Sequence, residues 1–209
     1  MTEFTWVLGC PRSGTTFVTD YLGRYADKTY NEPWDTHHLS DPASWVFPAV
    51  KKIVFKYCEN WRNLRALMGY TDSMYVHVWR DPDNVIHSMA HPKEGSWPPR
   101  NLYGQYNGRT RLWFCMERWY KNMLNCLAIY NVVKNYHEVR YENVEKDLGG
   151  LTDLSIPLRF NNRNVDCEID WDIHPLARSL RNVVGEFTGG CLAGWVNRKM
   201  PKLLGRPIL

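Results

Sequence analysis

The chain has 209 residues, of which 44% are hydrophobic and 23% are charged, and its formal net charge is +4. This length allows one α/β domain with a sizeable core, spanning 1–209, and is short for two domains. The positive charge is weaker than that of a dedicated nucleic-acid binder and is compatible with an anionic cofactor or substrate.

Cysteine spacing and hydropathy exclude further classes. The six cysteines form no C-x-x-C pair, which argues against a zinc knuckle and against a redox dithiol. No signal-peptide pattern precedes the first apolar run, and no window is apolar enough to cross a bilayer. We therefore expect a cytoplasmic protein with no membrane span.

The first half of the chain predicts strands and helices in alternation. A β-prone run at 4–8 meets Gly9 and Pro11, which is typical of a strand that enters a tight loop. From Thr15 onward apolar residues recur at three- and four-residue spacing, which predicts a helix. Further expectations are, in chain order, a short strand at 29–30, an irregular loop at 31–48, a helix at 51–68 and a strand at 74–79.

The second half continues this alternation. Asp81 and Pro82 predict the N-cap and the first-turn proline of another helix. The segment 91–111 is rich in proline, glycine and arginine, which predicts an irregular lid or substrate loop. A long helix at 111–134 and a strand at 137–141 are expected after it. Strands separated by helices predict an α/β fold, with a parallel, doubly wound sheet flanked by helices.

The segment from Gly9 to Thr16, G-C-P-R-S-G-T-T, is typical of a phosphate-binding loop. Its two glycines let consecutive backbone N–H groups converge on one anion, and the positive end of the following helix adds to the attraction. A nucleoside triphosphatase needs a lysine where Thr15 stands, whereas the cation here is Arg12, inside the loop. No acidic strand end that would hold magnesium is evident in the sequence. Arg12 is therefore placed to reach the bridging oxygen of a smaller group on a 5'-phosphate.

Two more motifs follow this loop. The stretch V-W-R-D-P-D-N-V-I-H-S-M supplies an arginine, an acidic residue, a proline and a serine, and V-R-Y-E-N-V supplies a Tyr-Glu pair at a strand end. The residues are Arg80, Asp81, Pro82, Ser88, Tyr141 and Glu142. With the loop, this set resembles the sulfotransferases that use 3'-phosphoadenosine 5'-phosphosulfate (PAPS), and the H-S-M ending is most similar to the tyrosylprotein branch. The nearest counterpart of that family's C-terminal basic loop is W-V-N-R-K-M-P-K at 195–202.

The resemblance implies a P-loop-containing nucleotide-binding fold, PAPS as co-substrate, 3'-phosphoadenosine 5'-phosphate (PAP) as product, and no obligatory metal. Arg12 would stabilise the departing phosphate oxygen. A 3'-phosphate carries about two negative charges, so the fork of Arg80 and the hydroxyl of Ser88 would bind it, while Tyr141 would lie near the adenine. The implied cofactor-binding residues of the loop are Pro11, Arg12, Ser13, Gly14, Thr15 and Thr16. Among these, the backbone of Ser13 to Thr16 would hold the 5'-phosphate together with the hydroxyls of Thr15 and Thr16.

The general base is expected at Glu32. In the tyrosylprotein enzymes a glutamate about twenty residues beyond the loop's basic residue has this role, and Glu32 stands twenty beyond Arg12. A strand at 29–30 would place it at the carboxyl edge of the sheet, and partial burial would raise its pKa toward that of a base. His37 and His38 are the alternatives, because imidazole needs no pKa shift.

The acceptor and two rival functions stay open. A hydroxyl or amine of a carbohydrate, a peptide or a small molecule would each suit the motifs. Tryptophan, tyrosine and arginine interleave in 91–111, so a module that binds nucleotides or nucleic acid is one rival, and a P-loop kinase for a small metabolite is the other. Among the remaining histidines, His77 is expected in the core, and His87 and His91 on a polar helix face.

Overall fold

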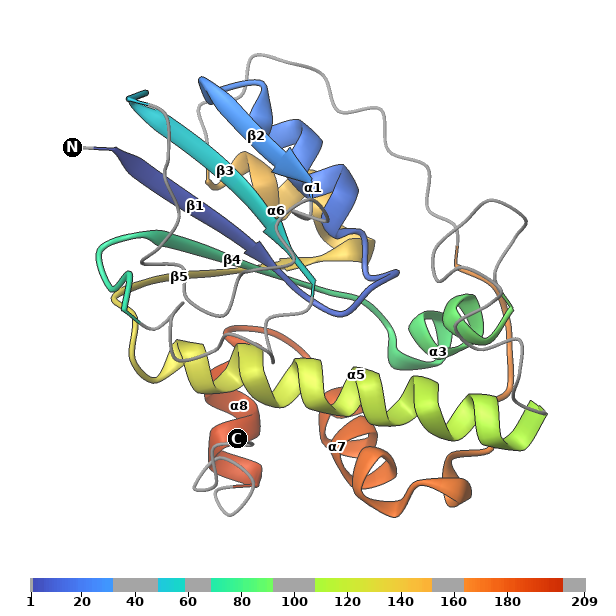
Figure 1. Ribbon diagram of the computed structural model, residues 1–209. Helices are drawn as coiled ribbons and strands as arrows, with labels where there is room; N and C mark the ends of the chain where they lie inside the picture. Colours follow the sequence, from blue (N-terminus) through green and yellow to red (C-terminus); the bar gives the residue numbers. More distant parts are fainter. Residues whose placement is uncertain (1, 32–48, 59–68, 92–107, 152–163, 201–209) are drawn as a thin grey trace.

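The computed structural model describes residues 2–31, 49–58, 69–91, 108–151 and 164–200. At its centre is a five-stranded sheet in the order β2-β3-β1-β4-β5, in which every neighbouring pair is parallel (Figure 1). The strands are β1 (Glu3–Leu8), β2 (Lys28–Asn31), β3 (Lys52–Tyr57), β4 (Met74–Trp79) and β5 (Asn135–Arg140). The expected parallel sheet is confirmed.

Helices cover both faces of the sheet (Figure 1). One face carries α1 (Thr15–Gly23) and α6 (Val144–Gly149), and the other carries α3 (Pro82–Ala90), α5 (Gly108–Tyr130), α7 (Pro175–Gly185) and α8 (Leu192–Lys199). Short 3-10 helices are η3 (Tyr141–Asn143) and η4 (Trp171–Ile173). The doubly wound arrangement expected from alternating strands and helices is therefore present.

Strand β1 shows why both faces must be covered. Trp6 and Leu8 point toward the α5 side, while Val7 points toward α1, and all three are 0% exposed. Successive side chains on a strand lie on opposite faces, so a strand that is apolar at consecutive positions is buried on both. This pattern explains why the first strand was predictable.

The expected helix at 51–68 is wrong in its first part. Residues Lys52–Tyr57 form β3, which lies between β1 and β2, and 59–68 lie outside the described residues. The run Ile53-Val54-Phe55 is buried. A short continuous apolar run fits a doubly buried strand or a buried helix equally well by periodicity, and its β-branched residues favour the strand.

Four other boundaries differ from the sequence-based expectations. The irregular segment expected at 91–111 ends earlier, because α5 already begins at Gly108, and 92–107 lie outside the described residues. Helix α5 ends at Tyr130, before the predicted end at 134, and β5 begins at Asn135, before the predicted start at 137. Tyr141 is the first residue of η3 and not the end of the strand.

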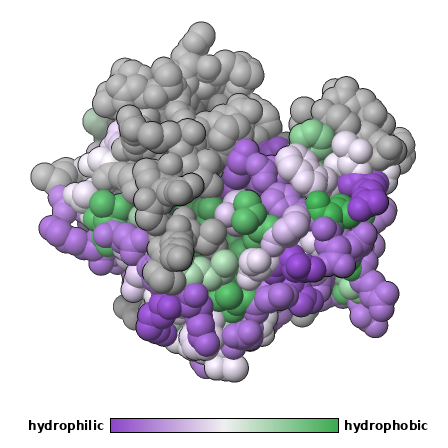
Figure 2. All heavy atoms as spheres, turned by 90° about the horizontal axis from the view of Figure 1, so that it is seen from below, coloured by the Kyte–Doolittle hydropathy of each residue, from purple (hydrophilic) through white to green (hydrophobic). Residues whose placement is uncertain are grey.

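The face that lies at the bottom of Figure 1 mixes apolar and hydrophilic side chains. Figure 2 shows hydrophobic patches separated by hydrophilic residues on this face. The large exposed apolar residues include Trp113, which stacks on His174 with ring centroids 5.3 Å apart. Within the described ranges no helix is both long and apolar enough to cross a membrane.

His77 is a core residue, as expected. It is 0% exposed, and within the described part of the chain neither ring nitrogen has a hydrogen-bond partner. Burial lowers the pKa of His77 from 6.5 to about 3, because a charged imidazolium would lose its hydration. The folded protein therefore keeps this ring neutral at pH values where the unfolded chain protonates it.

This difference predicts an acid-labile fold. Between pH 6.5 and about 3, His77 binds a proton in the unfolded state but not in the folded state. The free energy of unfolding therefore falls as pH falls through this window. From pH 7 to 4.5 His77 should account for roughly 2–3 kcal/mol of that loss. Urea denaturation of a His77→Leu variant should show a correspondingly smaller loss, while His91→Leu, at an exposed position, should behave like the wild type. An unchanged loss in His77→Leu would contradict the assignment.

Candidate functional site

The site lies at the carboxyl edge of the sheet, where the chain leaves β1, β4 and β5. Strand β1 is central, with β3 and β2 on one side and β4 and β5 on the other. In open parallel sheets the loops after the strands diverge at such a switch point, which is where ligands bind. The three sequence motifs follow these three strands directly, so the topology brings them to one edge.

Glycines permit the tight turn after β1. Gly9 has φ 151° and Gly14 has φ 98°. A Cβ on Gly9 would lie 2.3 Å from the carbonyl oxygen of Val78, and a Cβ on Gly14 would lie 2.5 Å from Cδ2 of Tyr141. Both positions thus require glycine for backbone conformation and for space.

Arg12 is the non-glycine residue of the described chain that has a positive φ, at 74°. A left-handed conformation costs a residue with a Cβ roughly 1–2 kcal/mol, and such strain concentrates at functional sites. The turn is held by Ser13, whose backbone N–H and hydroxyl both donate to the carbonyl of Cys10, at 3.1 and 2.6 Å. The loop is therefore a strained and well-supported turn.

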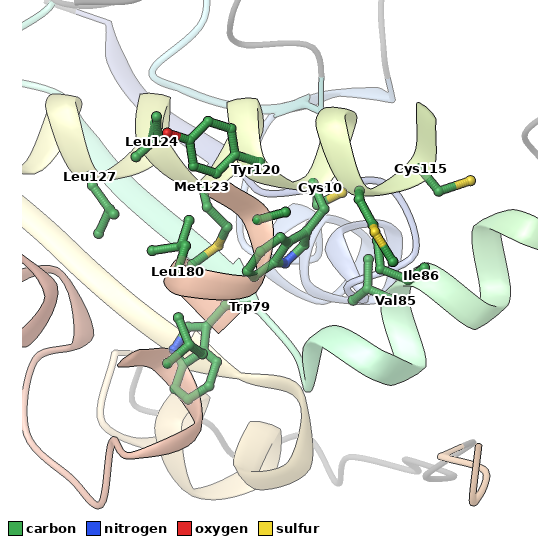
Figure 3. Packing of buried hydrophobic residues seen from close by; sticks show 14 of the residues in the cluster. Cys10, Trp79, Val85, Ile86, Cys115, Tyr120, Met123, Leu124, Leu127 and Leu180 are labelled. Carbon is green, nitrogen blue, oxygen red and sulfur yellow. The ribbon is translucent and has the colours of Figure 1, made fainter. Parts of the chain in front are cut away.

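The buried side chain of Cys10 anchors the loop in the hydrophobic core. This residue is 3% exposed and belongs to the core cluster between the sheet, α3 and α5, with Ile86 and Cys115 (Figure 3). Burial raises the pKa of the Cys10 thiol well above its usual range, so it stays a neutral packing group. Pro11, the next residue, is also buried.

Helix α1 begins directly behind the loop. Its N-cap is Gly14, which offers no side-chain cap, and the backbone N–H of Val18 donates to the carbonyl of Gly14. The first N–H groups of a helix have no partner within the helix, and together with the helix dipole they attract anions. This is the arrangement expected for a 5'-phosphate.

The two threonines of the loop differ in their surroundings. Thr15 is 2% exposed, and its Oγ1 lies 3.0 Å from Sγ of Cys58, just after β3. Thr16 is exposed. The hydroxyl of Thr15, which was expected at the phosphate, thus contacts Cys58 in the interior, whereas Thr16 is on the solvent side of the loop.

Arg12 contacts the second motif through its side chain. Its Nε donates to Oγ of Ser88 at 2.9 Å. Ser88 stands on α3, whose N-terminus is set by Asp81: the carboxylate of this cap accepts from the backbone N–H of Asn84 at 3.0 Å. The cap and Pro82 at the first turn confirm the expected start of this helix.

The orientation of α3 is fixed from its outer side. The carboxylate of Asp83 accepts from Nε1 of Trp171 at 2.5 Å and from Nη2 of Arg181 at 2.7 Å. These bonds tie the first turn of α3 to η4 and α7. Ser88 is therefore held toward the loop by contacts far away in the sequence.

Arg80 stands at the end of β4 and is 8% exposed. Its Nη1 donates to the backbone carbonyl of Arg12 at 3.2 Å, and its guanidinium lies 4.3 Å from the centre of the Tyr141 ring. Burial lowers the pKa of Arg80, but a guanidinium stays charged at any physiological pH. The structure thus brings Arg12, Arg80, Ser88 and Tyr141 together.

Two further residues complete this group. Nε of Arg80 donates to Oδ1 of Asn164 at 2.7 Å, and Nδ2 of Asn164 donates to Oε1 of Glu142 at 3.0 Å. Glu142 also accepts from the backbone N–H of Asp81 at 3.1 Å and from Nε of Arg140 at 3.0 Å. No sequence signal marks Asn164, because it lies 84 residues from Arg80 in an irregular segment.

The expected base lies outside the described residues, as do its alternatives His37 and His38. The strand predicted just before Glu32 is present as β2, which ends at Asn31, and Nδ2 of Asn31 donates to Asp20 of α1 at 3.2 Å. Strand β2 therefore ends at the carboxyl edge of the sheet. Glu32 stays a prediction.

The described part of the C-terminal candidate at 195–202 lies away from the loop after β1. Trp195 to Lys199 belong to α8, which packs beside the C-terminal end of α5, where a Cβ on Gly194 would lie 3.4 Å from the hydroxyl of Tyr130. Cys10 of the loop after β1 packs near Cys115. At 1.5 Å per residue along α5, Cys115 is about 22 Å from Tyr130, which marks the end of α5 that lies beside α8. Residues 201 and 202 lie outside the described part.

His87 and His91 lie at the end of α3 with ring centroids 4.7 Å apart. His87 is half-buried and His91 is exposed, as expected for a polar helix face. The pKa of His87 is lowered mainly by burial and to a smaller extent by the neighbouring His91. No group of three or more histidine, cysteine or acidic residues that could hold a metal occurs among the described residues.

Comparison with known proteins identifies the fold. No protein-family model and no curated protein sequence matches the chain. Mouse sulfotransferase SULT7A1, in a crystal structure complexed with PAP, is similar with a TM-score of 0.50 and 16% identity over 85% of this chain and 64% of that one. The sulfotransferase domain of the Synechococcus PCC 7002 olefin synthase is similar with a TM-score of 0.50 and 14% identity over 93% of this chain and 95% of that domain.

The chain thus covers less than two thirds of the mouse protein and nearly the whole of the bacterial domain. The likeness to the tyrosylprotein branch rests on sequence motifs alone. At these identities the comparison concerns the fold: a five-stranded parallel sheet with helices on both faces, which is the P-loop-type fold of sulfotransferases.

Proposed function

We propose that the protein is a sulfotransferase that uses PAPS and acts on a hydroxyl or amine of a carbohydrate, a peptide or a small molecule. The observation that carries the proposal is the convergence of Arg12, Ser88 and Arg80, which are joined by two hydrogen bonds at the switch point of the sheet. The mouse neighbour in the comparison was crystallised with PAP, which is in keeping with this co-substrate.

The 5'-phosphate would be held by the loop after β1. The backbone N–H groups of Gly14 to Thr16 and the helix dipole of α1 favour an anion there, and the exposed Thr16 adds a hydroxyl donor, while the N–H of Ser13 closes the turn on Cys10. The hydroxyl of Thr15 is directed to Cys58, so we assign Thr15 to the site through its backbone.

The 3'-phosphate would be held by Arg80 and Ser88. Both lie beside the phosphate loop, and the planar guanidinium suits the geometry of a phosphate. Tyr141 packs against the guanidinium of Arg80 and lies beside Gly14, which suits a role beside the nucleoside.

PAPS, when bound, supplies a sulfuryl group that passes from its phosphate oxygen to the acceptor. The role of Arg12 in this chemistry is to place a positive charge where negative charge develops on the departing oxygen. Glu32 would take the proton of the acceptor, with His37 or His38 as the alternative base. The loop and Arg80 keep the donor in place while this occurs.

Calorimetric titration tests the proposal most directly. PAP, ATP and AMP would be titrated into the full chain at the same salt concentration, since electrostatic binding depends on salt. We expect tight binding of PAP and at least tenfold weaker binding of ATP and AMP. A preference for ATP would refute the proposal and favour a kinase, and binding of none of the three would refute it as well.

A further inference from the structure

We propose that Asn164 is a positioning residue that makes the site selective for a 3'-phosphate, by separating Arg80 from Glu142. This inference rests on the proposed function and assigns a role to a residue that none of the sequence motifs contains. Its basis is the pair of hydrogen bonds that the Asn164 amide makes, one with each of these charged groups.

The amide group is inserted between a cation and an anion. Its oxygen accepts from Nε of Arg80 at 2.7 Å, and its nitrogen donates to Oε1 of Glu142 at 3.0 Å. An amide suits this place because it offers an acceptor to the arginine and a donor to the glutamate. A serine side chain is shorter than this amide, and an ionised acidic side chain has no hydrogen to donate to Glu142.

Without the amide, Arg80 and Glu142 are suited to pair directly. They are close enough for the charge of Glu142 to act on the pKa of Arg80, and a guanidinium binds a carboxylate in a fork. The geometry that suits a carboxylate also suits a phosphate. An internal Arg80–Glu142 pair would therefore compete with the 3'-phosphate for the same donors and neutralise the charge that attracts it.

Asn164 is itself held in place from α3. The backbone N–H of its neighbour Val165 donates to Oδ1 of Asn84 at 2.7 Å, and Asn84 in turn donates from Nδ2 to the cap residue Asp81 at 3.0 Å. Asn84 is 8% exposed. The segment that carries Asn164 is thus fixed to the same helix that carries Ser88, so the phosphate ligands and their spacer are fixed relative to one another.

The test compares binding of PAP with binding of 5'-AMP, which lacks the 3'-phosphate. In Asn164→Ala we expect PAP affinity to fall by about tenfold or more and 5'-AMP affinity to stay within about threefold of the wild-type value. Asn164→Asp keeps the shape of the side chain but pairs its own carboxylate with Arg80, so it should lower the PAP affinity further. Asn182→Ala, at an exposed position on α7, is the matched control and should bind both nucleotides normally.

A double variant separates this role from a general structural one. If Asn164 acts by keeping Glu142 off Arg80, then adding Glu142→Gln to Asn164→Ala should restore at least part of the PAP affinity, because the competing carboxylate is gone. A residue that merely supports the loop would lower affinity for both nucleotides, and the second substitution would not restore it.

The outcomes are distinguishable. An unchanged ratio of PAP to 5'-AMP affinity in the folded Asn164→Ala and Asn164→Asp proteins would overturn this inference while leaving the proposed function intact. Tighter PAP binding in Asn164→Ala would also overturn it, since it would mean that the amide occupies the place of the phosphate. Failure of the wild-type chain to bind PAP would refute the proposed function and this inference together.

Discussion

Replacing Arg80 with alanine is expected to weaken PAP binding by about 100-fold or more and to leave 5'-AMP binding within about threefold. The reason is that a hydrogen bond to a charged group contributes roughly 1.5–3 kcal/mol, and the guanidinium offers two such bonds to one phosphate. Burial strengthens the effect, since Arg80 is 8% exposed and water cannot easily replace it. Isothermal titration with both nucleotides measures the difference directly.

Arg80→Lys is the matched control for charge. A lysine keeps the positive charge but loses the fork and the contact of a planar group with the Tyr141 ring, so we expect an intermediate loss of PAP affinity. Because Arg80 also donates to Asn164, thermal unfolding of each variant must show that the protein is still folded. Equal losses of PAP and 5'-AMP affinity in Arg80→Ala would contradict a site for the 3'-phosphate.

Replacing Arg12 with alanine is expected to lower kcat by about 100- to 1,000-fold, the effect typical of removing one group that stabilises developing negative charge. PAP affinity should fall much less, by about fivefold or less, because the backbone N–H groups of the loop remain. The carbonyl that accepts from Arg80 belongs to the main chain and is retained, so the 3'-phosphate site should survive the substitution.

The measurement is the initial rate of PAP release from PAPS, with an acceptor found by screening or with water as acceptor. Arg12→Lys keeps the charge and is expected to retain more activity than Arg12→Ala. Alanine and lysine both have a Cβ, as arginine does, so neither variant changes the cost of the left-handed backbone at this position. Wild-type turnover in Arg12→Ala would show that this side chain is not part of the chemistry.

Elements with strong local signals were predictable from the sequence. The strand β1 and the loop with its two glycines follow from short-range sterics, and α3 follows from the Asp81 cap and Pro82. The helix expected at the position of β3 was wrong because this run pairs with β1 and β2, and its residues Ile53, Val54 and Phe55 are buried on both faces of the sheet, which no periodicity within the run indicates.

For the candidate site, the sequence by itself determined which residues carry the charges and hydroxyls, because each motif is a local pattern. Arg12 stands in a glycine turn, Arg80 at a strand end, and Ser88 on the helix that follows this strand. Only the tertiary structure decided how they meet. The parallel order of β1, β4 and β5 brings three distant motifs to one edge, and the position of β3 beside β1 brings Cys58 to Thr15. The tertiary structure also inserts Asn164 between Arg80 and Glu142, since a contact across 84 residues depends on how the chain packs and leaves no trace in local spacing.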